Sequence, residues 1–227
     1  MQREQTESIV LSRRDYGEAD RIVAFLSPKF GKISCLVKGA RKPKSKMAGG
    51  IELFCVSDIV FINGRSELKT LVGASSKRVY DNISKNLEKT MWLYEVLKLY
   101  NKHIESSADG DLYELLKNTI SFLNEQTSKL WAAKLYFYSR WLNLNGRNVD
   151  AYKEATGKVL ELNKTYNYDL LAQAFVLSSA GDFTAKDIKI IRLAQEYDVQ
   201  RLNRLSISID EGFKATNLFE RLVSLSL

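Results

Sequence analysis

The sequence predicts an α+β chain with a small N-terminal β-barrel over residues 1–80 and an all-helical C-terminal domain over residues 81–227. Two patterns support this division. Short β-branched runs separated by turn residues fill the first third, and no segment between them is long enough for a crossover helix. After Tyr80, apolar residues recur at the three- and four-residue spacing of amphipathic helices.

Five short runs in the first domain are expected to form strands, at Ser8–Arg14, Arg21–Leu26, Ile33–Val37, Ile51–Ile62 and residues 66–72. Between the last two, Asn63 and Gly64 both tolerate the positive φ of a type I′ turn and so predict a tight hairpin. Five strands without intervening helices favour the five-stranded oligonucleotide-binding (OB) barrel. An SH3-like barrel has the same strand count and fits the pattern as well.

The second domain is expected to contain seven helices, at Ile83–Ile104, Leu112–Leu123, 127–146, Ala151–Leu162, Asp169–Ser179, Lys186–Tyr197 and Asp210–Leu225. Asp109 or Asp111 is placed to cap the second helix, and Thr127 or Ser128 to open the third. Gly146 is placed to end the third helix. Thr184, with Asp187 three residues later, predicts a capping box.

The positive charge of the chain is confined to its first third. Residues 1–80 contain 15 Lys and Arg and 8 Asp and Glu, whereas the remaining residues contain 19 of each kind. A basic protein without a polyanionic partner would spread this excess over its surface. The asymmetry therefore favours an electrostatic binding face on the first domain.

The densest group of cations is the run KGARKPKSK between the third and fourth expected strands. Gly39 and Pro43 keep this run out of helix and strand. Its candidate DNA-binding residues are Lys38, Arg41, Lys42, Lys44 and Lys46, with Arg13, Arg14 and Lys32 as further candidates on the neighbouring strands. If four or five phosphates are neutralised, log K should fall against log salt with a slope of roughly −3 to −4.5.

Aromatic residues on an OB surface can stack on bases. Phe25, Phe54 and Phe61 lie in apolar runs and are expected in the core. Tyr16 and Phe30 lie at turns and are the two candidates for stacking, although packing is the favoured role for each. Nothing in the sequence indicates recognition of base edges, so we expect binding to be nearly independent of sequence.

Several classes of function find no support in the sequence. His103 is the only histidine, and Cys35 and Cys55 lie in apolar strand-like runs, so we expect no metal site, buried reduced thiols and no catalytic centre. Glu18 and Asp20 are better placed to orient Arg21 or the basic run than to catalyse. The N-terminus does not resemble a signal peptide and no run has the ~20 apolar residues of a membrane helix, so we expect a cytoplasmic protein.

Residues 8–54 resemble the N-terminal domain of the RecO family of bacterial DNA repair proteins. The shared motifs are an IVL strand at Ile9–Leu11, a Y-GE-D-I turn and strand at Tyr16–Ile22, a Gly31-Lys32 hairpin, and the KGAR-PKS run at Lys38–Ser45. The order in which these motifs occur makes the resemblance specific. The helical segment at Leu112–Leu123 is similar to the family as well.

The resemblance implies an OB-fold domain followed by a helical domain, in a recombination mediator that is not an enzyme. It implies nonspecific binding of single- and double-stranded DNA, annealing of complementary strands, and location at the bacterial nucleoid. The implied partners are RecR and the acidic C-terminal tail of the single-stranded DNA-binding protein (SSB), with RecA loaded onto SSB-coated DNA. Lys134 and Arg140, close to an aromatic cluster, are candidates for the basic rim of a groove for that tail.

Many RecO proteins carry a four-cysteine zinc module inside the helical domain. In this sequence residues 144–186 contain neither Cys nor His, so we expect no zinc and no other cofactor. One alternative stays open from the residues alone. A cationic OB barrel also suits an RNA-binding protein of the translation or RNA-processing type.

Overall fold

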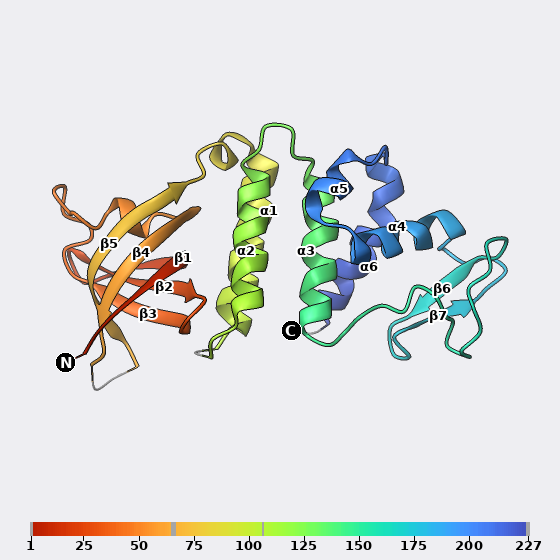
Figure 1. Cartoon of the computed structure of the whole chain (residues 1–227), viewed down its shortest axis with the longest axis horizontal. Coiled ribbons are helices and arrows are strands. Elements are labelled where there is room, and N and C mark those ends of the chain that lie inside the picture. The colour runs from red at the N-terminus through yellow and green to blue at the C-terminus, as the bar shows by residue number, and fades with distance from the viewer. Residues whose placement is uncertain (1, 65–66, 106, 226–227) are drawn as a thin grey trace. The chain divides into compact units, whose positions relative to one another are not determined.

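The computed structural model describes residues 2–64, 67–105 and 107–225. The chain forms two compact units, the first ending at Gln126 and the second beginning at Thr127. The first unit contains strands β1 (Arg3–Tyr16), β2 (Asp20–Ser27), β3 (Gly31–Val37), β4 (Cys55–Ile62) and β5 (Lys69–Val79), followed by helices α1 (Leu87–His103) and α2 (Gly110–Leu123) (Figure 1). The prediction of strands followed by helices is therefore confirmed.

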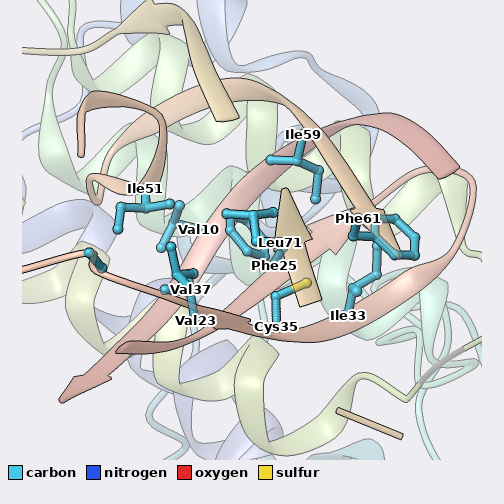
Figure 2. Packing of buried hydrophobic residues seen from close by; sticks show 11 residues of the cluster. Val10, Val23, Phe25, Ile33, Cys35, Val37, Ile51, Ile59, Phe61 and Leu71 are labelled. Carbon is cyan, nitrogen blue, oxygen red and sulfur yellow. The ribbon is translucent and has the colours of Figure 1, made fainter. Parts of the chain in front are cut away.

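The five strands close into a barrel in the order β1-β2-β3-β5-β4. Every neighbouring pair is antiparallel except β3 and β5, which run parallel and pair only through Cys35 with Lys69 and Leu36 with Thr70. This short parallel seam closes the barrel. Side chains from all five strands fill the interior, among them Val10, Phe25 and Phe61 (Figure 2).

The middle of β1 and the second half of β2 are buried on both faces. Val10 and Phe25 pair across the two strands and belong to the barrel core, while the adjacent pair, Ile9 and Leu26, is also fully buried. Because neighbouring residues of a strand point to opposite faces, a second layer must cover the outside of these strands. Helix α1 contacts β1 and helix α2 contacts β2, so the helix pair provides that layer.

The domain boundary expected at residue 80 marks the end of the barrel strands, and as a domain boundary it stays a prediction. In the structure, α1 and α2 belong to the same compact unit as the barrel. Asn86 caps α1, and Asp109, rather than Asp111, caps α2 by accepting a hydrogen bond from the backbone N–H of Leu112.

Two details of the barrel differ from the sequence prediction. The fourth strand begins at Cys55 instead of Ile51, because Gly49–Ile51 forms a 3-10 turn and Phe54 has a φ of 60°. Ile62 pairs with Thr70, so the connection after β4 is longer than the expected two-residue turn at Asn63-Gly64. Residues 65 and 66, at the expected start of the fifth strand, lie outside the described residues.

The second unit contains α3 (Leu130–Leu144), strands β6 (Tyr166–Asp169) and β7 (Ala174–Leu177), and helices α4 (Ala185–Glu196), α5 (Val199–Arg204) and α6 (Ile209–Ser224). Several helix ends agree with the prediction. Gly146 follows the end of α3 with a φ of 70°, and Thr184 and Asp187 form the expected capping box of α4. Lys129, and not Thr127 or Ser128, occupies the N-cap position of α3.

The prediction of an all-helical second domain is wrong. The segments expected as helices at Ala151–Leu162 and Asp169–Ser179 form turns, isolated bridges and the β6–β7 hairpin. Aromatic packing explains this result, because the ring of the fully buried Phe175 lies 5.1 Å from that of Tyr168 and 5.5 Å from that of Phe183. These contacts bring together three segments that a prediction from helical periodicity assigns to separate elements.

Candidate nucleic-acid interface

The basic run forms an ordered loop that is fastened to the β1–β2 turn. A carboxylate oxygen of Asp20 accepts a hydrogen bond from the backbone N–H of Gly39 at 2.7 Å, and the carbonyl of Ala19 accepts one from the N–H of Arg41 at 2.9 Å. Gly39 has a φ of 64°, a conformation that residues with a side chain adopt at a cost. The Y-GE-D turn thus holds the start of the basic loop in place. The prediction that Asp20 orients the basic run is confirmed.

The far end of the same loop is fastened to β5 and to the barrel core. Ile51 is fully buried in the core cluster, and Ala40, near the start of the loop, is a buried member of the same cluster. Gly50 lies so close to β5 that a Cβ there would sit 2.6 Å from the carbonyl carbon of Ala74 and 2.7 Å from the amide nitrogen of Ser75. A residue with a side chain would force the loop away from the strand.

All five loop cations are exposed: Lys38, Arg41, Lys42, Lys44 and Lys46. Arg41 lies near Asp15, with 3.6 Å between its Nε and a carboxylate oxygen, and Asp15 also accepts a hydrogen bond from Nε of Arg21 at 3.0 Å. The hydrogen bond from Arg21 and the charge of Arg41 keep the pKa of Asp15 below its usual value. The four loop lysines have no ion pair with any described residue, so their charges are available to a ligand.

The three further candidates occupy different environments. Arg13 is partly buried and its guanidinium lies 2.6 Å from a carboxylate oxygen of Glu52. Arg14 is exposed, and because it neighbours Arg13 along β1 its side chain points to the opposite face of the strand. Lys32 lies at the other end of β3 from the loop, where its Nζ donates to the carbonyl of Asn101 at 2.6 Å. The structure therefore brings Arg13 near the loop and separates Lys32 from it.

The structure places the three expected core residues as predicted but separates the two aromatic residues at turns, Tyr16 and Phe30. Phe25 and Phe61 are buried in the barrel core and Phe54 is 8% exposed. Phe30 packs edge-to-face on Phe61, with ring centroids 5.4 Å apart. Tyr16 is 53% exposed at the tip of the β1–β2 hairpin, next to the turn that holds the basic loop. Of these residues, Tyr16 is the one presented for stacking.

Sequence reasoning missed a second group of cations in the first unit. At the end of β5, residues 75–79 are all exposed, and among them are Lys77 and Arg78. Lys117 of α2 reaches the same place, where Glu7 of β1 accepts hydrogen bonds from Lys77 at 2.6 Å and Lys117 at 2.7 Å. Distance along the chain hid this group, since its cations come from β5 and α2 and the carboxylate between them comes from β1. The one feature of the sequence that could have indicated this group is the polar run SSKR, residues 75–78, which lies inside β5.

Glu7 is the acidic centre of this group. Burial alone would raise its pKa, but hydrogen bonds from Lys117, Lys77 and Tyr113 outweigh burial and lower the pKa to about 2. The phenol of Tyr113 donates to the same carboxylate at 2.7 Å, and burial, together with this hydrogen bond, raises the pKa of that phenol. Glu7 therefore stays ionised at all physiological pH values and ties α2 to the barrel.

The cysteines behave as structural residues. Cys35 and Cys55 are free and buried, as expected, and burial raises the pKa of the Cys35 thiol to about 12. Such a thiol is protonated and unreactive at neutral pH. Among the described residues no cluster of three or more His, Cys, Asp or Glu side chains is arranged to hold a metal ion, and no described helix has the length and apolar character needed to span a membrane.

The fold and the surface together define a class: an α+β protein with a closed N-terminal barrel and five exposed cations on one anchored loop. Comparison with known proteins makes the class specific. Residues 1–80 match the family model described as recombination protein O N terminal. Over 212 residues the chain is 27% identical to the DNA repair protein RecO of Dehalococcoides mccartyi, covering 90% of this chain and 83% of that protein.

Further relatives have the same name. The DNA repair protein RecO of Halalkalibacterium halodurans is 24% identical over 214 residues, which cover 89% of this chain and 82% of the relative. That of Alkaliphilus metalliredigens is 31% identical over 127 residues, 56% of this chain and 51% of the relative. The family model over residues 1–80 and the relatives of similar length support assignment of the chain to the RecO family.

Proposed function

We propose that this protein acts in DNA repair and homologous recombination by binding single- and double-stranded DNA and annealing complementary strands. The observation that carries the proposal is the anchored loop with five exposed cations, four of them without an ion pair among the described residues. A loop held at both ends presents these charges in a fixed arrangement, so binding a phosphate backbone requires little further ordering. Relatives named DNA repair protein RecO support the same role.

The barrel is proposed to be of the OB type. Its strand order β1-β2-β3-β5-β4, with a parallel β3–β5 closure, fits the five-stranded Greek-key barrel that binds oligonucleotides through its loops. The helix pair α1 and α2 covers the outside of β1 and β2. DNA is therefore expected to use the end of the barrel that carries the basic loop and Tyr16.

Binding in this arrangement is electrostatic and independent of sequence. Lysine ammonium groups act as point charges toward phosphates, while Arg41 can offer a planar pair of donors. The loop cations contact phosphates and not base edges, and Tyr16 can stack on any base. A mediator that anneals arbitrary complementary strands needs such tolerance, and it has no need of a catalytic centre, a metal or another cofactor.

The finer elements of the proposal come from the family: RecR as partner, the acidic tail of SSB as a docking peptide, and RecA as the protein loaded onto SSB-coated DNA in the bacterial cytoplasm. The second unit offers partial support for the peptide site. Lys134 is partly exposed, but Arg140 donates to the carbonyls of Gln195 and Tyr197, at 2.6 and 3.2 Å. Lys134 is therefore the better candidate for the rim of a peptide groove.

Annealing of complementary strands coated with the cognate SSB tests the proposal. The intact chain is compared with a variant in which Lys38, Arg41, Lys42, Lys44 and Lys46 are all changed to Ala. The control variant carries five exposed cations from elsewhere changed to Ala: Lys98, Lys102, Lys153, Lys158 and Lys189. Both variants lose the same charge, so a difference between them reports the loop and not the net charge.

We expect annealing by the intact chain and the control, and its loss in the loop variant. Failure of the intact chain to anneal, combined with tight binding of structured RNA, would overturn the proposal in favour of an RNA-binding role. Full annealing by the loop variant would show that DNA binds elsewhere. Circular dichroism of each variant confirms that the barrel is folded before the comparison is made.

A further inference from the structure

A small pocket of about 210 Å³ lies at the C-terminal end of β5. It is lined by residues of β1, β4, β5 and α2 and by the segment that follows β5: Glu7, Val56, Lys77, Arg78, Tyr80 and Lys117. All of these residues belong to the first unit, whose β5 and α2 are labelled in Figure 1. Since a water molecule occupies about 30 Å³ in the liquid, the pocket has room for a group the size of a phosphate.

The lining of the pocket is rich in hydrogen-bond donors. The guanidinium of Arg78 is exposed and forms no ion pair with a described residue, so its five N–H groups are available. Lys77 and Lys117 each have three N–H groups, and both are held at the rim by Glu7. The carboxylate fixes the positions of the two ammonium groups and leaves part of their donor capacity unused.

Tyr80 provides the independent observation. The residue is only 4% exposed and lines the pocket, yet its hydroxyl has no hydrogen-bond partner among the described residues. Buried hydroxyl groups are nearly always paired, so an unpaired one at a donor-lined pocket indicates a ligand acceptor. The phenol lies close enough to Tyr113 to affect its pKa, which places it beside the Glu7 group.

The charges around the pocket are balanced. Glu7, Asp58 and Glu114 oppose Lys77, Arg78 and Lys117, with Glu114 lying 3.8 Å from Lys117 and Asp58 raising the pKa of Lys77 together with Glu7. The pocket therefore does not attract anions over long distances. Its donors can instead select an anion that another part of the surface has already brought close.

The basic loop is in position to bring that anion. Gly50, at the end of the loop, packs directly on Ala74 and Ser75 of β5, and the exposed residues 75–79 continue from this contact to the pocket. We propose that the pocket binds one phosphodiester group of the DNA strand held by the basic loop, with Arg78 and the Tyr80 hydroxyl as its donors. This inference rests on the proposed function and extends the DNA path from the loop along the end of β5.

Fluorescence anisotropy with a labelled oligothymidine at a series of salt concentrations tests the inference. Two variants are compared with the parent: Tyr80→Phe, which removes only the unpaired hydroxyl, and Arg78→Ala. Arg3→Ala is the control, because Arg3 is an exposed cation at the start of β1, where it pairs with Ile62 and not with the part of β4 that lines the pocket. Melting temperatures are measured for all four proteins.

We expect Tyr80→Phe to weaken binding about tenfold, the effect of one hydrogen bond to a charged group, without lowering the melting temperature. Arg78→Ala should weaken binding and make the salt slope shallower by about 0.7, the value for one phosphate of a single strand. Arg3→Ala should change neither quantity. Parental affinity and salt slope in both pocket variants would overturn the inference.

The same experiment separates this inference from the proposed function. Binding of oligothymidine by the parent, with loss in the five-alanine loop variant, supports the proposed function whatever the pocket variants do. A parent that binds no DNA overturns both. If Tyr80→Phe lowers the melting temperature, the hydroxyl has a structural partner and its assignment as a ligand donor is wrong, and the salt slope of Arg78→Ala then decides whether a phosphate reaches the pocket.

Discussion

The Asp20 carboxylate accepts a hydrogen bond from the backbone N–H of Gly39 at 2.7 Å, which joins the first hairpin of the barrel to the loop that carries five exposed cations. These two residues are nineteen positions apart in the sequence and belong to two motifs that look independent. In the structure they form one unit, because the acidic turn holds the first residues of the basic loop. The Y-GE-D motif therefore has a structural role, because it holds the loop whose cations the proposed function requires.

Changing Asp20 to Ala should loosen the basic loop. The substitution leaves the Gly39 N–H without its partner and should destabilise the first unit by about 1–3 kcal/mol. We expect DNA affinity to fall severalfold, because the cations are no longer held in place. Amide hydrogen exchange at Gly39, which should accelerate, and anisotropy with DNA measure the two effects. Glu18→Ala, an exposed change in the same turn, is the control, and equal exchange rates in both variants would contradict the anchoring role.

The neighbouring glycines at the end of the loop should respond differently to the same change. Gly50→Ala places a methyl group against the backbone of β5 and should lower stability by about 1–3 kcal/mol. Gly49→Ala meets nothing within 4 Å and should change stability by less than about 0.5 kcal/mol. Urea unfolding of the two variants provides the comparison. Similar midpoints would mean that the loop does not pack on β5 as described.

Lys32 should prove structural, although the sequence places it among the candidates for DNA. Its ammonium donates to the carbonyl of Asn101 near the end of α1, so Lys32→Met should cost about 1–2 kcal/mol of stability and leave the salt slope of DNA binding unchanged. Lys44→Met, in the loop, should leave stability unchanged and make the slope shallower by about 0.7. A shallower salt slope with unchanged stability for Lys32→Met would show instead that Lys32 contacts DNA.

Glu7 should make the first unit sensitive to acid. Its pKa is lowered from 4.5 to about 2 on folding, so its stabilising effect is present at neutral pH and is lost as the pH falls from about 4.5 to about 2. The shift corresponds to a contribution on the order of 3 kcal/mol at pH 7. Urea unfolding of Glu7→Gln should show this deficit at pH 7 and less than half of it at pH 3.

Glu18→Gln is the matched control for the acid experiment, because Glu18 is exposed and forms no ion pair with a described residue. Its stability should follow that of the parent at both pH values. A Glu7→Gln variant whose deficit is the same at pH 7 and pH 3 would show that the carboxylate contributes through its shape and not through its charge.

The sequence alone determined the local features of this protein. The succession of strands along the first 80 residues, the amphipathic helices outside residues 151–179, the capping box at Thr184 and the helix end at Gly146 all follow from the spacing and backbone preferences of neighbouring residues. The density of cations at Lys38–Lys46 and the order of motifs that resembles RecO were likewise visible in the sequence. Each of these signals lies within a short window, where local chemistry is sufficient.

Tertiary structure decided what depends on distant residues. Helical periodicity could not reveal the β6–β7 hairpin, because the packing of Phe175 against Tyr168 and Phe183 stabilises it. Charge counting could not separate Lys32, whose ammonium is bound to a helix carbonyl, from the free lysines of the loop. Nor could it bring Lys77 and Lys117 together around Glu7. Ion pairing and burial are properties of three-dimensional neighbours, so only the folded chain shows which cations are left for a ligand.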